Sequence, residues 1–181
     1  VIILPSKRAC GFLLNHLKSS ADKTFFPPKI SSIEEFIQEI SNLKIIDPTE
    51  LLFESYKVYL KVISNQEKDS FEVYSSWATT LLNDFNEIDR HLISTNSFFN
   101  YLSTIKNINH WGVQNEQTQL VKNYLKFWNS LPSFYDLLRT ELIHKNQGYQ
   151  GLIYREAAEN IEYYKSNSSN KSGSKLLFGC T

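Results

Sequence analysis

The chain opens on an apolar run that is followed at once by a turn and a helical pattern. Val1-Ile2-Ile3-Leu4 is apolar on both faces, which is typical of a central strand in a parallel sheet covered by helices. Pro5 and Ser6 come next, and Ser6 is suited to cap a helix in which apolar residues recur at helical spacing from Ala9 to Leu17. The opening segment therefore predicts a strand, a turn and a helix, the unit from which α/β sheets are built.

A second apolar run lies at the other end of the sequence. Residues 175–179 read KLLFG and predict a strand, and the nine polar residues SNSSNKSGS at 166–174 predict a flexible loop before it. We expect the two terminal strands to pair in one sheet. The expected fold is α/β but mostly helical: residues 1–30 and 175–181 form a small parallel α/β core, and residues 31–165 form a large all-α insertion.

Helix start signals and apolar stripes divide the insertion. Ser32 with Glu35 matches a capping box for a helix over 32–41, and Asp47-Pro48 begins a helix that runs to about residue 63. Ser70 begins the most regular apolar stripe, which continues to Leu92. Further helices are predicted over 96–106, 115–130, 133–146 and 150–165, separated by residues 109–112, by Leu131-Pro132 and by a turn at 146–148.

Composition limits the class of protein. The 181 residues are 41% hydrophobic, enough to bury a core, and no apolar run approaches the roughly 20 residues needed to span a bilayer. No secretory signal opens the chain, so we expect a soluble, cytoplasmic protein without membrane contact. Cys10 and Cys180 cannot form a disulfide framework and are expected to be reduced and buried. The absence of Met predicts a processed chain or a fragment of a longer protein.

The net charge is zero, but the charges are unevenly distributed. Residues 1–30 carry five basic side chains and one acidic, residues 31–90 carry five basic and twelve acidic, and residues 91–181 carry nine basic and six acidic. A protein that wraps duplex DNA would show an overall basic excess, so that class is not supported. A local basic contact near the N-terminus is compatible with this distribution.

Most catalytic motifs are absent. The sequence contains no phosphate-binding loop of the Gly-x-x-x-x-Gly-Lys-Ser/Thr type, no adjacent acidic pair after an apolar strand, no Gly-x-Ser-x-Gly, and no pair of His at zinc-binding spacing. No cofactor is therefore predicted for this chain. Asp84, Glu87 and Asp89 could share a divalent ion, but a helix end with local ion pairs, or an interdomain hydrogen-bond site, is the simpler interpretation.

One short segment has a chemistry suited to a ligand. Ser6, Lys7 and Arg8 place a hydroxyl group and two cations just after the first strand, at the start of a helix. Ligands bind at that edge of open α/β sheets, and helix N-termini attract phosphate. A solvated first turn with two ordinary surface cations fits the same residues equally well.

The sequence also resembles a known family. VIILPSKRACGFLLNHL resembles the strand and helix of motif Ia in superfamily-one helicases, in particular the AddB-like subunits of bacterial double-strand-break repair helicase-nucleases. WATTLLNDFNEIDRHL, LKFWNSLPSFYDLL and GYQGLIYREAAE resemble helical segments of large PD-(D/E)XK nuclease family proteins with an AddB-like architecture. The resemblance covers nearly the whole chain, and DFNEIDR and YxGxxYREAAE are its most specific parts.

The resemblance implies a role in DNA repair or recombination. Ser6, Lys7 and Arg8 would touch the backbone of single-stranded DNA, and a partner helicase-nuclease subunit would bind the parent protein. KLLFGCT aligns with the strand that carries Walker B carboxylates in active helicases, but those carboxylates are missing here. The implied fold is therefore a degenerate P-loop-NTPase or helicase-like one that does not hydrolyse ATP. The chain also lacks the nuclease motif, so a Mg²⁺-dependent nuclease would lie elsewhere in the parent.

Three functions follow as alternatives. The leading expectation is a scaffold that contacts single-stranded DNA for a nuclease domain outside this chain. The second is a helical protein-interaction module that binds no nucleic acid and uses the acidic region 31–90 or exposed aromatic residues to hold a partner. The third is an autonomous metal enzyme that uses Asp84 and Glu87.

Overall fold

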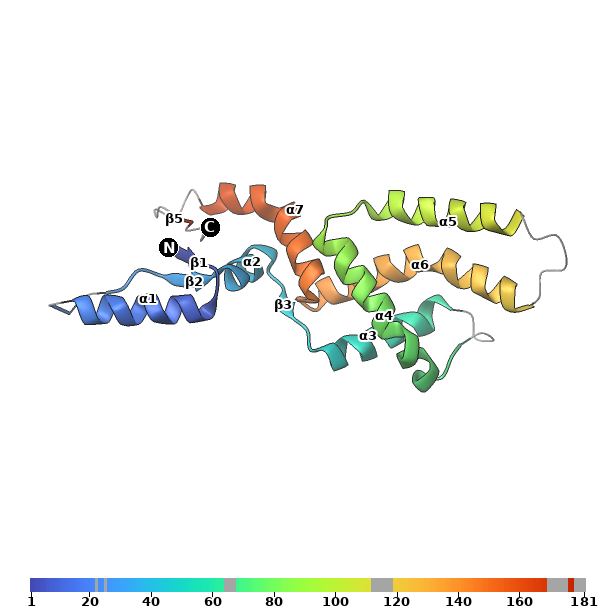
Figure 1. Ribbon diagram of the computed structural model, residues 1–181, viewed down its shortest axis with the longest axis horizontal. Coiled ribbons are helices and arrows are strands. Elements are labelled where there is room, and N and C mark those ends of the chain that lie inside the picture. The colour runs from blue at the N-terminus through green and yellow to red at the C-terminus, as the bar shows by residue number, and fades with distance from the viewer. Residues whose placement is uncertain (22, 25, 64–67, 112–118, 169–175, 178–181) are drawn as a thin grey trace. The chain divides into compact units, whose positions relative to one another are not determined.

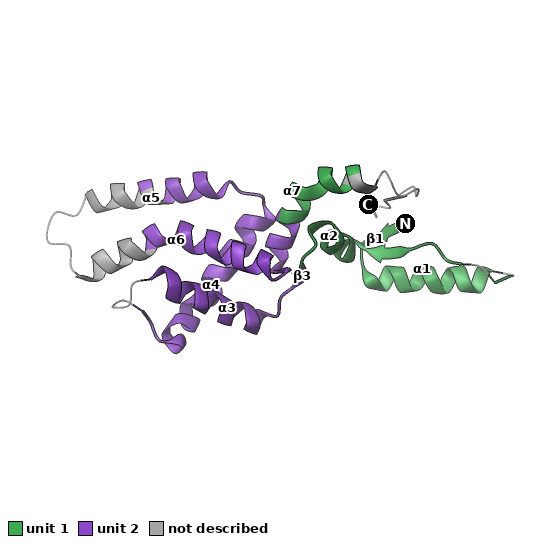
Figure 2. Cartoon of the chain, turned by 180° about the vertical axis from the view of Figure 1, so that it is seen from behind, with its two compact units in different colours: residues 1–43, 156–181 green, residues 44–155 purple. Residues whose placement is uncertain are grey.

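The computed structural model describes residues 1–21, 23–24, 26–63, 68–111, 119–168 and 176–177. The elements in chain order are β1 (Ile2–Leu4), α1 (Lys7–Ser20), β2 (Ile30–Ser32), α2 (Ile33–Ser41), β3 (Lys44–Ile45), α3 (Pro48–Val62), α4 (Phe71–Arg90), α5 (Thr95–Trp111), α6 (Gln119–His144), β4 (Gln147–Gly148), α7 (Gln150–Ser168) and β5 (Leu176–Leu177) (Figure 1). The chain divides into unit 1, residues 1–43 and 156–181, and unit 2, residues 44–155 (Figure 2).

Unit 1 is built on a three-stranded parallel sheet in the order β2-β1-β5. Strand β1 pairs Ile2 with Ile30 and Leu4 with Ser32 on one side, and Ile2 with Leu176 on the other. The two terminal apolar runs therefore lie side by side, as the sequence predicts. Residues 175, 178 and 179 of the expected last strand lie outside the described residues.

The predicted helix starts are confirmed by their caps. The side chains of Ser6, Asp47 and Ser70 each accept a backbone N–H from the first turn of α1, α3 and α4. Ser32 and Glu35 form the complete capping box at α2. Each such cap satisfies an N–H that lacks a partner within the helix, which is worth about 1 kcal/mol.

The core of unit 2 lies along α4, which packs against α3 and α6. Tyr74 and Phe85 of α4 are fully buried, with ring centroids 4.8 Å from Tyr59 of α3 and 5.2 Å from Tyr135 of α6. The Tyr74 hydroxyl donates to Ser55 Oγ at 2.8 Å, so the buried phenol keeps a hydrogen bond. The stripe that begins after Ser70 is therefore core, as its regular spacing predicts.

The break predicted at Leu131-Pro132 is wrong, because α6 runs through Pro132 without interruption. Proline removes a backbone hydrogen bond and normally costs a helix interior about 3 kcal/mol. Here Leu131 before it and Phe134 and Tyr135 after it are all at most 4% exposed. Burial of these side chains on both sides of the proline offsets that cost, since each is worth about 1.5–3 kcal/mol.

Other element boundaries differ from those predicted, and residues 31–165 are not all-α, because they include most of β2 and the paired strands β3 and β4. Helix α5 continues to Trp111, past the break expected from residue 109, and α7 continues through 166–168, which were expected to belong to the flexible loop. The rest of that loop, 169–174, and the predicted helix start at 115 lie outside the described residues. At 146–148, Asn146 adopts a positive φ of 54° as a turn requires, but residues 147–148 then form β4, which pairs in parallel with β3.

The protein is mostly helical, with two small parallel sheets. The expectation that Cys10 is buried is wrong: it is a free thiol and only half-buried, on a helix that contains no fully buried residue. Cys180 lies outside the described residues. Among the helical residues that the structure describes, no stretch combines the length and the hydropathy required to cross a bilayer.

Candidate functional site

Ser6, Lys7 and Arg8 lie at the carboxyl edge of the unit 1 sheet. Strand β1 ends at Leu4, and the N–H of Ala9 donates to Ser6 Oγ at 3.2 Å, which starts α1 directly after the strand. Leu4 is in register with Ser32, the last residue of β2, so the first turns of α1 and α2 both follow this edge. The strand, turn and helix predicted from the sequence thus place the three candidate residues at a ligand-binding edge of the kind found in parallel sheets.

A carboxylate that sequence reasoning missed shares this edge. Glu35 Oε1 lies 3.3 Å from Lys7 Nζ, and Glu35 Oε2 accepts the backbone N–H of Ser32 at 3.1 Å. The hydrogen bond from the Ser32 N–H lowers the pKa of Glu35 most, and the Lys7 ammonium lowers it further. The Lys7 side chain is still 72% exposed, and Arg8 is exposed as well. The capping box in the sequence locates Glu35 on α2, but only the strand register brings it to Lys7.

The three carboxylates at the end of α4 do not converge on a common point. Asp84 is exposed, and Glu87 forms ion pairs with Arg90 at 3.8 Å and with His91 at 3.4 Å. The third carboxylate, Asp89, has no exposed surface. The predicted helix end with local ion pairs is confirmed for Glu87, and among the described residues no group of three His, Cys, Asp or Glu could hold a metal ion.

Asp89 is the centre of a buried polar cluster in unit 2. Its Oδ1 accepts hydrogen bonds from the Tyr135 hydroxyl and, at 2.6 Å, from Arg155 Nε, and its Oδ2 accepts one from the Tyr149 hydroxyl. The Arg155 side chain is 9% exposed. A buried charge is tolerated when it is paired and its lone pairs are satisfied, and this carboxylate meets both conditions.

Arg155 also closes the end of α4. Its Nη2 donates to the carbonyl oxygens of Ile88 at 3.1 Å and Ile93 at 2.7 Å, in the turn where Leu92 adopts a positive φ of 52°. The Ile88 carbonyl, in the last turn of α4, also accepts the Ile93 N–H at 3.0 Å, so the guanidinium adds a second donor there and places a cation at the negative end of the helix dipole. The arginine therefore pairs with the Asp89 carboxylate and caps the helix that carries it.

The same junction requires Gly151 at the start of α7. The Gly151 N–H donates to Asn86 Oδ1 at 2.8 Å, and a Cβ added at Gly151 would lie 2.1 Å from the backbone oxygen of Asn86. The segments DFNEIDR and YxGxxYREAAE thus meet through Asn86 with Gly151 and Asp89 with Arg155. Neither segment alone reveals this pairing. The available signal in the sequence was one Asp and one Arg, each lying among the apolar residues of a predicted helix.

Burial and the Asp89 charge raise the pKa of Tyr149 and of Tyr135, so both phenols stay protonated and donate to the carboxylate. Tyr149 is 6% exposed and Tyr135 is 1% exposed. All four residues of the cluster are buried, so the arrangement holds the helices of unit 2 together.

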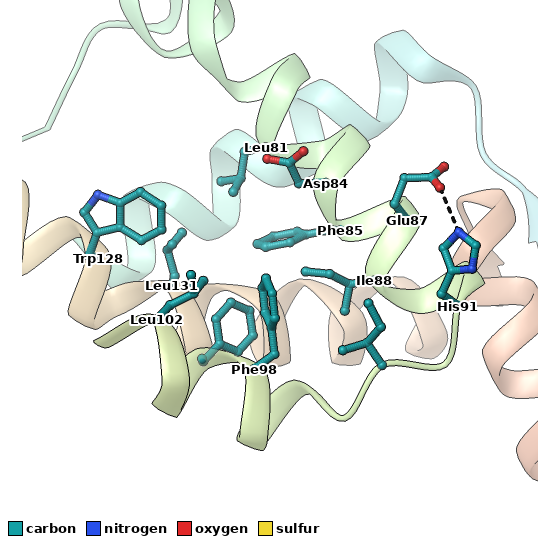
Figure 3. A pocket seen from close by; sticks show the side chains of 12 residues that line it. Leu81, Asp84, Phe85, Glu87, Ile88, His91, Phe98, Leu102, Trp128 and Leu131 are labelled. Carbon is teal, nitrogen blue, oxygen red and sulfur yellow. Dashed lines mark ion pairs between the residues drawn. The ribbon is translucent and has the colours of Figure 1, made fainter. Parts of the chain in front are cut away.

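An apolar cavity of about 430 Å³ lies between α4, α5 and α6 in unit 2 (Figure 3). Phe85, Phe98 and Leu102 form part of its wall, and Trp128 lies at the end opposite His91. Three polar side chains also line it: Asp84, Glu87 and His91. The cavity offers hydrophobic surface with the exposed Asp84 carboxylate beside it, whereas Glu87 already pairs with Arg90 and His91. This suits an apolar group that carries positive charge near Asp84.

No known family model matches this chain, and no curated protein matches it either.

Proposed function

We propose that this chain is the helicase-like scaffold region of a DNA repair or recombination protein of the AddB-like type, and that Lys7 and Arg8 contact single-stranded DNA. The observation that carries the proposal is the placement of two exposed cations directly after the central strand of a parallel sheet. Phosphates bind at helix N-termini, and ligands of open α/β sheets bind at the carboxyl ends of the strands.

The finer parts of this proposal rest on the resemblance. The sheet of unit 1 would be a degenerate P-loop-NTPase-like core without ATP hydrolysis, and residues 31–165 would supply its helical accessory region. The nuclease and any Mg²⁺ would belong to a domain outside these 181 residues, as would the surface for a partner subunit. Strand order and parallel pairing in unit 1 are compatible with such a core.

The test is a binding titration with labelled oligo-dT, followed by fluorescence anisotropy at about 50 and 200 mM salt. We expect salt-dependent binding by the full chain. The double variant Lys7→Glu, Arg8→Glu should bind about tenfold more weakly at the lower salt, and its plot of log K against log salt should be shallower by about 1.4, because each single-strand phosphate contact contributes about 0.7.

The control changes the same charge in unit 2. Lys57 is 63% exposed and paired with Glu54, as Lys7 is paired with Glu35, and Lys44 is exposed like Arg8. The variant Lys57→Glu, Lys44→Glu should therefore bind DNA almost as the unchanged chain does. Equal weakening by both double variants, or no salt-dependent binding by the unchanged chain, would contradict the proposal.

The cavity between α4, α5 and α6 favours a second candidate, a protein-interaction module without nucleic-acid binding. Its occupant would be an amphipathic partner helix that inserts an apolar side chain and carries Lys or Arg beside Asp84. Helix-in-groove recognition uses such apolar anchors, and complementary charge selects the partner.

A synthetic Leu/Lys amphipathic peptide should then bind, whereas a Leu/Glu peptide of the same length should not. Asp84→Lys should weaken the Leu/Lys complex several-fold through like-charge repulsion, while Glu72→Lys, an exposed change on the same helix, should not. Binding of both peptides to the same extent would show that the cavity carries no charge preference and would remove this candidate.

A further inference from the structure

The solvent face of α1 combines positive charge with a large exposed aromatic ring. Arg8 and Phe12 are four residues apart, so they lie on one side of the helix, about 6 Å apart along its axis. Phe12 is 70% exposed. The helix carries Lys7, Arg8 and Lys18 and contains no acidic side chain. An anion that reaches Arg8 would therefore find the Phe12 ring within about one helical turn.

Gly11 leaves the backbone of this face uncovered. A glycine inside a helix costs roughly 0.5–1 kcal/mol relative to alanine and puts no side chain over the backbone beside it. At Gly151 the Asn86 backbone fills that space, whereas a Cβ added at Gly11 would meet nothing within 4 Å. No neighbour within the described chain requires the glycine, and the backbone beside Phe12 is open to an incoming ligand.

A single exposed phenylalanine is common on protein surfaces and would need no explanation alone. The combination here is more specific, because the ring, the bare glycine and the cations follow one another on the helix that begins at the carboxyl edge of the sheet. Proteins that bind single strands without sequence preference use a positively charged groove for the backbone and aromatic rings for the bases.

We propose that Phe12 stacks on a base of a single-stranded nucleic acid whose phosphates lie against Lys7 and Arg8. The inference rests on the proposed function and adds to it the residue that contacts a base. Because every base has a flat face, the contact would be tolerant of sequence. Gly11 would let the sugar and base approach the helix closely.

Stacking and charge can be separated by their salt dependence. In the anisotropy titration, Phe12→Ala should weaken oligo-dT binding about tenfold, because stacking on one base is lost. The slope against log salt should stay that of the unchanged chain, since no phosphate contact is removed. Phe12→Leu should weaken binding as much as Phe12→Ala, whereas Phe12→Trp should retain it. Tyr163→Ala removes another exposed ring of unit 1, 72% exposed, and should have no effect.

An oligonucleotide with abasic sites gives the second arm. The unchanged chain and Phe12→Ala should bind it equally, because no base is available to stack. If Phe12→Leu binds oligo-dT like the unchanged chain, or if Phe12→Ala still weakens abasic binding tenfold, the contact is not stacking and the inference is overturned. If salt-dependent binding is lost in Lys7→Glu, Arg8→Glu but unchanged in Phe12→Ala, the stacking inference is overturned and the proposed function stands. Absence of binding by the unchanged chain overturns the proposed function first.

Discussion

The junction of α4 with α7 and the first turn of α1 use charged residues in opposite ways. At the junction, Asp89 is fully buried and its carboxylate accepts hydrogen bonds from Tyr135, Tyr149 and Arg155. In the first turn of α1, Lys7 is 72% exposed and has one carboxylate nearby. The charges of the junction pair with one another in the interior, whereas those of α1 are exposed to solvent.

This difference separates two kinds of sequence motif. Within DFNEIDR and YxGxxYREAAE, the structure accounts for Asn86, Asp89, Gly151 and Arg155 through contacts inside unit 2. These residues are therefore explained by the fold, without a ligand. The less distinctive Ser-Lys-Arg segment is the one whose side chains face solvent, and it is there that binding is proposed.

Of the variants considered, Asp89→Asn should lower the stability of the protein most. Replacing the carboxylate leaves Arg155 without a charged partner in a buried site, so we expect unit 2 to lose about 3–5 kcal/mol of unfolding free energy. All three Trp lie within residues 44–155, so tryptophan fluorescence during urea unfolding reports on this unit. Asp84→Asn, an exposed change on the same helix, should stay within about 0.5 kcal/mol. Similar losses for both variants would mean that the cluster does not stabilise the junction.

The two helical glycines offer a smaller and more discriminating test. Gly151→Ala would place a methyl group against the Asn86 backbone, and we expect about 1–3 kcal/mol of destabilisation. Gly11→Ala has free space and should stabilise its helix by about 0.5–1 kcal/mol, because alanine is the better helix former. Thermal unfolding followed by far-ultraviolet circular dichroism measures both. The opposite signs are the prediction, and two changes of the same sign would contradict it.

Alkaline pH should weaken unit 2 through its buried tyrosines. Burial raises the pKa of Tyr74, and burial together with the Asp89 carboxylate raises the pKa of Tyr135 and Tyr149 above the ordinary value of 10.0. A raised folded-state pKa gives stability that is complete below pH 10 and is lost as the pH rises beyond it, by about 1.4 kcal/mol per pH unit for each tyrosine. In urea unfolding between about pH 9 and 11, the unfolding free energy of Tyr135→Phe should fall less steeply with pH than that of the unchanged chain, because one titrating tyrosine is absent. An identical slope would contradict the assignment.

Local signals in the sequence were sufficient for much of the fold. Ser6, Ser32, Asp47 and Ser70 each begin a helix where predicted, because an N-cap depends on residues within one turn. The continuity of α6 across Pro132 was not predictable in this way, since it depends on burial against other helices. Local rules therefore locate helix starts better than helix interiors.

The candidate sites show the same limit. Ser6, Lys7 and Arg8 were placed correctly at a strand end because strand, turn and helix follow one another directly in the chain. The contact of Lys7 with Glu35 depends on the pairing of β1 with β2, and the contact of Asp89 with Arg155 joins residues 66 positions apart. Charge patterns in one segment cannot reveal partners that only the tertiary fold supplies.

The smallest expected effect on stability concerns Glu35. Glutamine also suits the third position of a capping box, and an exposed ion pair is worth at most about 1 kcal/mol, so Glu35→Gln should change stability by less than that. It should, however, raise affinity for oligo-dT roughly two- to fivefold at low salt, because Lys7 no longer shares its charge with a carboxylate. The gain should vanish in a Lys7→Gln background. A gain that persists there would place the competing charge elsewhere and would separate Lys7 from the proposed DNA contact.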